Sequence, residues 1–306
     1  AEIILNFEEG QSYLLVPADL PFTTENVIPD TVPTIELPSV MKIAEKPVNM
    51  INLDTAELST DGVNFDEPLS VMGIKDTLLR ERYDGDIWLR FTFDASAEYI
   101  KSAENLRISV EPMNVKEVCV NGSEIYEIPG AWWFDKKFTV YDILPYAKEG
   151  RNEITIKLHH WQRDYVYYVL YGGVSESLRN CLVFDCEVED IYLLGDFCVK
   201  CDGRFTDGER RSVLFDGKFS LEPQRDEIHI SDIVTDGYPF YAGHFKSSFV
   251  YNYSEGMPTV LKLTGRYAVC DVTVNGSEAG TLMFSNYLDL SDHLREGKNE
   301  IILNMC

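Results

Sequence analysis

Two seven-residue stretches of the chain are nearly identical: VCVNGSE at residues 118–124 and VTVNGSE at residues 272–278. In both, Asn-Gly stands between runs in which apolar and polar residues alternate. A type I′ turn needs a positive φ at both of its central residues, and Asn and Gly adopt that conformation most readily. The sequence therefore predicts that Asn121-Gly122 and Asn275-Gly276 are hairpin tips, and that the repeat is a repeat of architecture.

The similarity extends on both sides of the two turns. Residues 106–122, LRISVEPMNVKEVCVNG, align without a gap with residues 260–276, VLKLTGRYAVCDVTVNG. Further along, residues 140–158, VYDILPYAKEGRNEITIKL, share their pattern with residues 287–305, YLDLSDHLREGKNEIILNM. Self-similarity of this kind predicts two copies of one β unit, with longer loops in the first copy.

Alternation also marks the strand that precedes the first copy. In DIWLRFTF, residues 86–93, apolar side chains occupy every second position, as expected of a half-buried strand. Its weaker counterpart before the second copy is GHFKSSFVYNY, residues 243–253. Amphipathic helices are scarce, although residues 61–85 predict a short one. The sequence therefore predicts an all-β fold.

The chain has 306 residues with 27 basic and 51 acidic side chains, a formal charge of -24. Such a surface repels nucleic acids and anionic membranes, so we expect neither as a partner and expect a neutral ligand. Apolar runs near 18 residues, the length of a membrane span, are absent from the sequence. An odd count of seven cysteines favours reduced thiols and a cytoplasmic location, whereas a removed signal peptide would imply secretion.

Proline spacing suggests how the chain is divided. Residues 1–49 contain prolines at positions 17, 21, 29, 33, 38 and 47 and are predicted to be an extended leader, the end of a preceding domain. Residues 50–203 are predicted to form a first β-sandwich with long aromatic loops. Residues 204–306 are predicted to form a second one, truncated at its C-terminus.

The repeated pattern, an apolar strand with V-x-VNG, a loop, and then EG-(K/R)-N-E-I, resembles the galactose-binding-like jelly roll of glycoside hydrolase family 2 and of related large bacterial rhamnosidase-like glycosidases. The resemblance covers residues 50–306 and implies two tandem jelly-roll β-sandwiches. In that family the catalytic carboxylates lie on a (β/α)8 barrel, for which this sequence offers no alternating strand–helix series. The resemblance therefore implies a non-catalytic accessory region whose partner is an upstream catalytic domain.

From the motifs in the sequence we predict no catalytic residues, no metal ligands and no cofactor for this chain. The sequence has no Gly-rich phosphate loop, no His-Glu-x-x-His and no Gly-x-Ser-x-Gly. Cys198 and Cys201 are separated by an odd number of positions, which places them on opposite faces of a strand. The acidic row Asp185, Glu187 and Glu189 is compatible with a calcium site, but a solvated strand face explains it without an ion.

One aromatic cluster predicts a carbohydrate site. GAWWFDKKF (residues 130–138) and HHWQRDYVYYVLYGG (residues 159–173) combine rings that can stack on the C–H faces of sugars with polar groups that can bind hydroxyls. The residues predicted to bind carbohydrate are Trp132, Trp133, His160, Trp161, Arg163, Asp164 and Tyr168. The alternative is that these aromatics fill a core: Tyr165, Tyr167 and Tyr171 share the parity of strand residues that face one side.

Two other functions remain open at this point. A stand-alone carbohydrate-binding or adhesion module would have the same sandwiches with no enzyme upstream. A β-sandwich enzyme acting on glycans would use carboxylates near Trp132 and Trp161.

Overall fold

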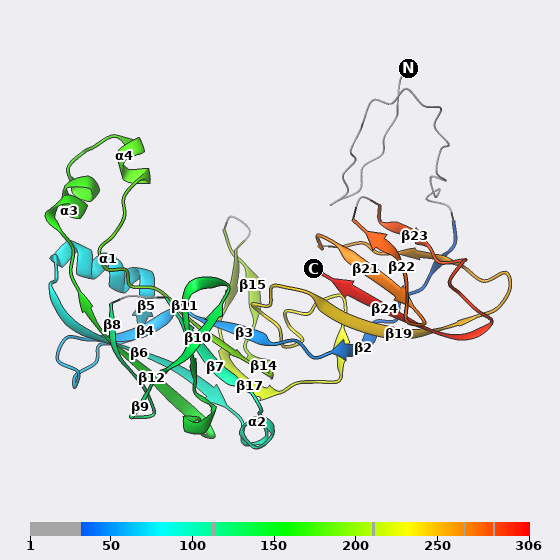
Figure 1. Ribbon diagram of the computed structural model, residues 1–306, viewed down its shortest axis with the longest axis horizontal. Coiled ribbons are helices and arrows are strands. Elements are labelled where there is room, and N and C mark those ends of the chain that lie inside the picture. The colour runs from blue at the N-terminus through cyan, green and yellow to red at the C-terminus, as the bar shows by residue number, and fades with distance from the viewer. Residues whose placement is uncertain (1–31, 112–113, 210–211, 266, 284) are drawn as a thin grey trace. The chain divides into compact units, whose positions relative to one another are not determined.

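The computed structural model describes residues 32–111, 114–209, 212–265, 267–283 and 285–306, so most of the predicted leader, residues 1–31, lies outside the described residues. The chain divides into two compact units (Figure 1). The large unit consists of Val48–Gln224 and Val234–Tyr241. The small unit consists of the described residues up to Pro47 together with Arg225–Ile233 and Ala242–Cys306.

Two sheets form the large unit, and their strands confirm the predicted all-β class. One sheet has the order β10-β11-β7-β13-β3, with the bounds Glu127–Trp133, Asp135–Asp142, Leu106–Val110, Ile191–Gly195 and Asn49–Leu53. The other has the order β14-β17-β6-β12-β8-β9, with the bounds Phe197–Asp202, Lys218–Pro223, Gly85–Ala95, Gly150–His160, Val115–Val120 and Ser123–Ile125. Strands β4 (Thr55–Ser59) and β5 (Leu69–Ser70) join the second sheet beside β6, and β15 (Phe205–Asp207) pairs with β16 (Val213–Phe215) as a separate hairpin.

The core of the large unit lies between these two sheets. Alternate residues of β6 and β12 are buried, and Leu89 pairs directly with Ile156 in the antiparallel register. From the facing sheet, β7 and β13 contribute Ile108 and Leu193 to the same buried cluster. Each of these four side chains has no exposed surface, so apolar burial between the two sheets holds this sandwich together.

The small unit is built around a six-stranded sheet of order β18-β2-β19-β24-β21-β22, with the bounds Glu227–His229, Val40–Glu45, Phe245–Tyr253, Gly297–Met305, Cys270–Val274 and Ser277–Leu282. A second sheet has the order β1-β20-β23, with the bounds Thr34–Ile35, Val260–Lys262 and Tyr287–Asp289. Part of the predicted leader is therefore strand, since β1 and β2 belong to this unit. Met41 of β2 is buried in its core beside Val272 and Ile301.

The sequence repeat corresponds to a repeated strand order, because β6-β12-β8-β9 in the large unit has its counterpart in β19-β24-β21-β22 in the small one. Both predicted hairpin tips are confirmed. Asn121 and Gly122 have φ values of 49° and 81° between β8 and β9, and Asn275 and Gly276 have 52° and 82° between β21 and β22.

Helices are few and short in the described residues: α1 (Val71–Glu81), α2 (Ala97–Ser102), η1 (Leu144–Tyr146), α3 (Asp164–Tyr171) and α4 (Glu176–Asn180). The predicted short helix within residues 61–85 is confirmed as α1. It begins where the Ser70 hydroxyl accepts a hydrogen bond of 3.1 Å from the backbone N–H of Gly73, and it ends at Arg82 in the left-handed conformation. None of the helices that the structure describes is both long and apolar enough to cross a bilayer.

The expectation of a strand through Tyr165, Tyr167 and Tyr171 is wrong, because these residues lie on helix α3. Residues 182–190, all of them described, form no regular strand either, although Cys186 and Val188 are buried between partly exposed neighbours, as the alternation predicts. None of the seven cysteines, all of which lie in the described ranges, forms a disulfide, and Cys198 is buried in β14 while Cys201 is partly exposed.

Candidate carbohydrate-binding surface

The predicted site begins at His160, the last residue of β12. Only 1% of His160 is exposed, and its Nδ1 lies 2.8 Å from the carbonyl oxygen of Tyr83. Burial lowers the pKa of the imidazole, and the bond to Tyr83 opposes that shift. His160 therefore anchors the end of β12 from inside the protein through its hydrogen bond to the Tyr83 carbonyl.

A short cross-connection then fixes the start of α3. The Gln162 side chain donates to the carbonyl of Cys186 and accepts 2.9 Å from the backbone N–H of Asp185. In return, the Asp185 carboxylate accepts from the backbone N–H of Arg163 at 2.9 Å and lies 3.0 Å from the Arg163 Nε. Because Arg163 is already paired in this way, its guanidinium holds the segment in place as well as facing solvent.

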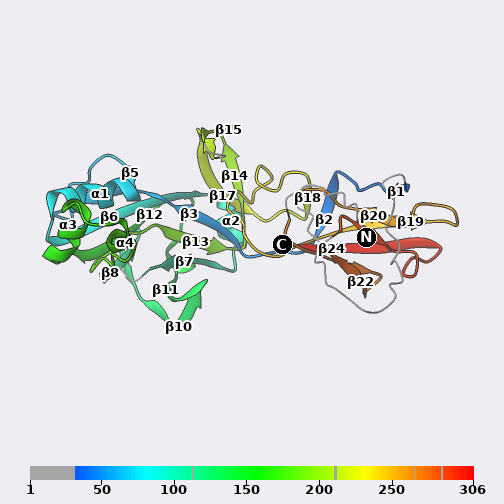
Figure 2. The same ribbon diagram turned by 90° about the horizontal axis from the view of Figure 1, so that it is seen from above.

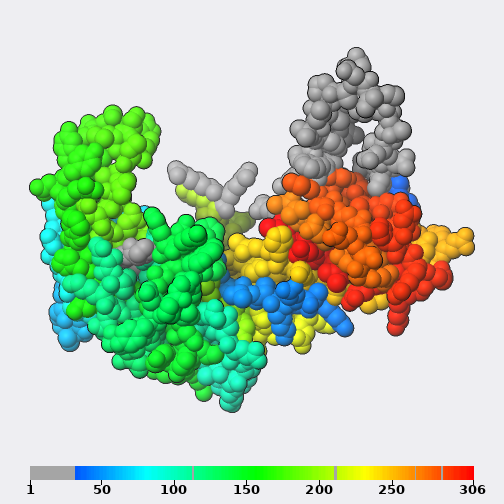
Figure 3. Space-filling view, in the orientation of Figure 1, coloured from blue at the N-terminus to red at the C-terminus, as the bar shows by residue number. Residues whose placement is uncertain are grey.

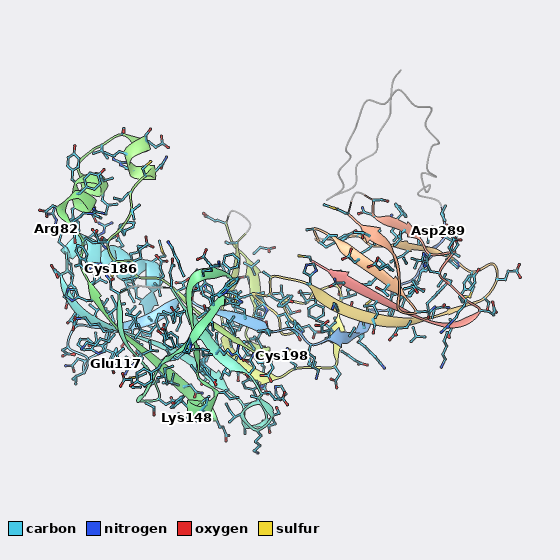
Figure 4. The ribbon with its side chains drawn as sticks, in the orientation of Figure 1. Arg82, Glu117, Lys148, Cys186, Cys198 and Asp289 are labelled. Atoms are coloured by element: carbon cyan, nitrogen blue, oxygen red, sulfur yellow. The ribbon has the colours of Figure 1, made fainter. Side chains whose placement is uncertain are left out.

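Helix α3 separates its side chains into two faces. Val166, Tyr167 and Val169 point inward and are buried, and the guanidinium of Arg82 lies 4.8 Å from the centre of the Tyr167 ring. Burial raises the pKa of the Tyr167 phenol. Arg82 is labelled in Figure 4 beside α3, where it closes the inner side of the helix.

The outer face of α3 is aromatic. Tyr165, Tyr168 and Tyr171 are 48%, 58% and 53% exposed, and Asp164 is exposed beside them. Trp161, just before the helix, is also exposed. Figure 3 shows the α3–α4 segment in light green at the surface of the large unit. We call Trp161, Asp164, Tyr165, Tyr168 and Tyr171 the tyrosine face.

The two predicted tryptophans lie on another element, at the end of β10. Trp132 is 54% exposed, whereas Trp133 is half-buried, with its ring centre 5.1 Å from that of Tyr192 and 5.9 Å from that of Phe134. Register shifts on both sides of Trp132 mark an irregular pairing with β11. Successive side chains of a strand point to opposite faces, so Trp132 faces outward while Trp133 packs against Tyr192.

The seven predicted residues thus fall into two groups. His160, Trp161, Arg163, Asp164 and Tyr168 belong to one continuous segment, and Trp132 and Trp133 to the β10–β11 hairpin. Within the part of the chain that the structure describes, no hydrogen bond, ion pair or ring contact joins the two groups. Figures 1 and 2 show α3 and β10 apart in both views.

Residues beyond the predicted set also belong to this surface. Tyr165 and Tyr171 are nearly as exposed as Tyr168, although a strand period predicts them to be packing residues; the segment is helical, so that period does not apply. Asp164 at the first position and Gly172-Gly173 after the last are the usual helix signals that could have identified α3.

The acidic row Asp185, Glu187 and Glu189 has a lysine beside two of its carboxylates. Lys75 of α1 places its Nζ 2.7 Å from Oε1 of Glu189 and 3.7 Å from Oε2 of Glu187. Burial, and then the hydrogen bond to Glu189, raise the pKa of the Glu187 carboxyl. Within the described ranges, no group of three or more His, Cys, Asp or Glu side chains could hold a metal ion.

Comparison with known proteins gives structural likeness only. No protein family matches the chain, and no curated protein matches it. Among solved structures, it is similar to a β-D-mannosidase from Dictyoglomus thermophilum, with 13% identity and a TM-score of 0.33 over 84% of this chain and 31% of the enzyme. It is also similar to a β-glucuronidase from Ruminococcus gnavus, with 12% identity and a TM-score of 0.34 over 89% of this chain and 43% of the enzyme.

This chain spans less than half of each enzyme. The β-glucuronidase in complex with uronic deoxynojirimycin gives the same picture, with 12% identity and a TM-score of 0.33 over 90% of this chain and 44% of the enzyme. Identities and scores this low do not assign the chain to a family.

Proposed function

We propose that this chain is a non-catalytic accessory β-sandwich region of a bacterial glycoside hydrolase and that it binds neutral carbohydrate. The observation that carries the binding proposal is the tyrosine face. Tyrosine and tryptophan rings present flat apolar surfaces and keep a polar group at the ring edge, which suits the C–H faces and hydroxyls of a sugar. A row of such rings exposed on a protein surface is typical of a site that binds a ligand or a partner.

The polar groups beside the rings support a neutral ligand. Asp164 stands on the same helix face and accepts hydrogen bonds from hydroxyl groups. The overall charge of -24 disfavours an anionic ligand. In this proposal the rings of Trp161 and Tyr168 stack on the sugar. Asp164 and Arg163 contact its hydroxyl groups. The buried His160 holds the segment in place.

Trp132 and Trp133 make a second, smaller contact in the same proposal. Trp132 offers an open ring, and Trp133 supports it through its contact with Tyr192. The accessory role rests on the resemblance of the repeated VNG and EG-(K/R)-N-E-I motifs to the sugar-binding sandwiches of family 2 glycosidases. Its partner is then a catalytic domain in the longer protein.

The test is calorimetric titration of the 306-residue chain with a panel of neutral oligosaccharides. We expect one class of glycan to bind, with affinity at least fivefold weaker in Trp161→Ala and Tyr168→Ala. Tyr126→Ala removes an exposed ring at another place, just after β9, and should bind like the unaltered protein. A folded protein that binds no glycan, or variants with unchanged affinity, would overturn the binding role. Hydrolysis of any panel member by this chain alone would overturn the non-catalytic role.

A further inference from the structure

A second site lies elsewhere in the large unit, in a cavity of about 760 Å³. Its floor comes from β3, β4 and β6, and its wall from the β15–β16 hairpin, β17 and the segment around Phe240. Figure 2 shows the β15 hairpin rising next to β14 and β17. Small-molecule sites typically measure about 300–1,000 Å³, so this cavity has the size of one.

Four phenylalanines line one wall of the cavity as a ladder. The ring centres of Phe205 and Phe215 are 4.7 Å apart, and those of Phe215 and Phe219 are 4.5 Å apart with an interplanar angle of 7°. Phe240 continues the ladder edge-on, 5.6 Å from Phe219. We call Phe205, Phe215, Phe219 and Phe240 the phenylalanine ladder.

The ladder is only partly buried, because Phe205, Phe215 and Phe219 keep part of their surface exposed and Phe240 is 37% exposed. Val213 and Leu214, on the same hairpin, also line the cavity and are more than half exposed. A ligand that covers apolar side chains at the mouth of a cavity removes them from water, and this burial favours its binding. Phenylalanine has no polar atom, so this wall favours a flat apolar group over a fully hydroxylated one.

Charged side chains also line the cavity, with a small excess of negative charge. The carboxylate of Glu57 is paired with Arg90 and lies 3.2 Å from a guanidinium nitrogen of Arg151. Of the remaining charged side chains that line the cavity, Asp54 and Asp94 are acceptors and Lys218 is a donor. Two carboxylates against one ammonium disfavour an anionic ligand and provide partners for hydroxyl groups.

We propose that this cavity binds an uncharged small molecule in which a planar aromatic ring is joined to a hydroxylated group, the chemistry of an aryl glycoside. The aromatic ring stacks on the phenylalanine ladder, and the hydroxyl groups bind Asp54, Asp94 and Lys218. The site is separate from the tyrosine face, and its ligand needs an apolar part that a simple glycan lacks.

The test is a calorimetric titration of the full chain with phenyl β-D-glucopyranoside and phenyl β-D-galactopyranoside. Methyl β-D-glucopyranoside and methyl β-D-galactopyranoside supply the sugars without the ring, and catechol supplies a hydroxylated ring without the sugar. We expect at least one phenyl glycoside to bind about tenfold or more tightly than both its methyl counterpart and catechol. Equal affinity for the methyl glycosides overturns the aromatic part of the proposal, and equal affinity for catechol overturns the glycoside part.

Variants locate the binding. Phe215→Ala should weaken it about tenfold, and Phe215→Leu, which keeps most of the volume and loses the ring, should weaken it at least threefold while the chain stays folded. Phe134→Ala removes an exposed ring on the β10–β11 hairpin and should leave the affinity unchanged. Loss of binding in Trp161→Ala but not in Phe215→Ala would place the phenyl glycoside on the tyrosine face and overturn the proposal. Absence of saturable binding by either phenyl glycoside, or full affinity in Phe215→Leu, would overturn the proposal.

Discussion

Asn121 and Asn152 are joined by a hydrogen bond of 2.9 Å from the Nδ2 of the first to the Oδ1 of the second. The small unit repeats this bond between Asn275 and Asn299, at 2.8 Å. In both units the turn asparagine also accepts 3.1 Å from the backbone N–H of the residue after its partner. The two motifs that recur in the sequence, VNG and EG-(K/R)-N-E-I, therefore supply the two asparagines of one hydrogen-bonded pair. We call each pair, Asn121 with Asn152 and Asn275 with Asn299, an asparagine clasp.

The inner asparagine of each clasp is fully buried and satisfied. Asn152 accepts from the backbone N–H of Lys148 at 2.8 Å and donates to the carbonyls of Lys148 and Gly150. Asn299 does the same with Arg295 and Gly297. Buried polar groups need partners, so the Asn of EG-(K/R)-N-E-I and the Asn of VNG require each other.

Replacing the inner asparagine should be costly. Asn152→Ala leaves the Lys148 N–H, two carbonyls and the Asn121 amide without their partner, and we expect a loss of about 2–4 kcal/mol in the free energy of unfolding. Urea denaturation measures the loss. Asn180→Ala, at the exposed end of α4, serves as control and should change the free energy by less than about 0.5 kcal/mol. A loss in Asn152→Ala no larger than in the control would contradict the clasp.

Two glycine substitutions should differ sharply although both glycines have a positive φ. At Gly122, φ is 81° and a Cβ would meet nothing within 4 Å, so Gly122→Ala should cost only the left-handed penalty of about 1–2 kcal/mol. At Gly237, φ is 109° and a Cβ would lie 2.1 Å from the Sγ of Cys198.

The carbonyl of Gly237 also accepts 2.8 Å from the buried Asn49 side chain, so the backbone there cannot move away freely. We expect Gly237→Ala to lower the melting temperature several times more than Gly122→Ala in the same calorimetric scan. Similar melting temperatures for the two variants would show that the Cys198 side chain can move aside without lowering the stability of the protein.

The Glu187 carboxyl should make stability depend on pH in an unusual direction. Because its pKa is raised in the folded state, its contribution is full below the unfolded pKa of about 4.3 and is lost as the pH rises through the folded value. Glu187→Gln should therefore raise the melting temperature at pH 7.5, and the gain should shrink toward pH 4. Glu67→Gln, a change of the same kind at an exposed position, is the matched control. A gain independent of pH would rule out ionisation as the cause.

The Asp86 carboxyl should titrate in the opposite direction. Lys116 at 2.5 Å, and then His159 Nδ1 at 2.9 Å, lower its pKa to about 2. Its contribution is therefore present above the unfolded pKa of about 3.9 and is lost as the pH falls through 2.

In Lys116→Met the pKa of Asp86 should rise toward 3.9, though not fully, because His159 and Lys157 remain beside the carboxylate. Carboxyl-carbon NMR titration measures the shift, and Lys136→Met, an exposed lysine of β11, is the matched control. An unchanged Asp86 pKa in Lys116→Met would show that His159 and Lys157 keep it low without Lys116.

Local chemistry explains what could be predicted from the sequence. The Asn-Gly turns, helix α1 and the alternating strand β6 each depend on residues within about a dozen positions of one another. Tyr and Val favour strands, so the sequence does not predict helix α3, and the burial of Val166 and Val169 in the folded chain outweighs that preference.

The phenylalanine ladder could not have been predicted in this way. Phe205 and Phe240 are far apart in the sequence, and the ladder exists only because β15 pairs with β16 while β17 pairs with β14. No short pattern in the sequence encodes those pairings. The predicted jelly-roll count and the seven predicted sugar-binding residues stay predictions.

The pairing of β2 with β19 sets an order of events during synthesis on the ribosome. Lys246 of β19 forms an ion pair with Glu45, 201 positions earlier, so the neighbour of β2 is translated long after β2 itself. Until then β2 presents an unpaired edge, the kind of surface that recruits chaperones or pairs with another nascent chain. The large unit takes most of its strands from one continuous stretch and can complete most of its sandwich in that interval. Slow translation between residues 50 and 245 would therefore lengthen the exposure of β2, and the yield of soluble protein should depend on chaperone supply at that stage.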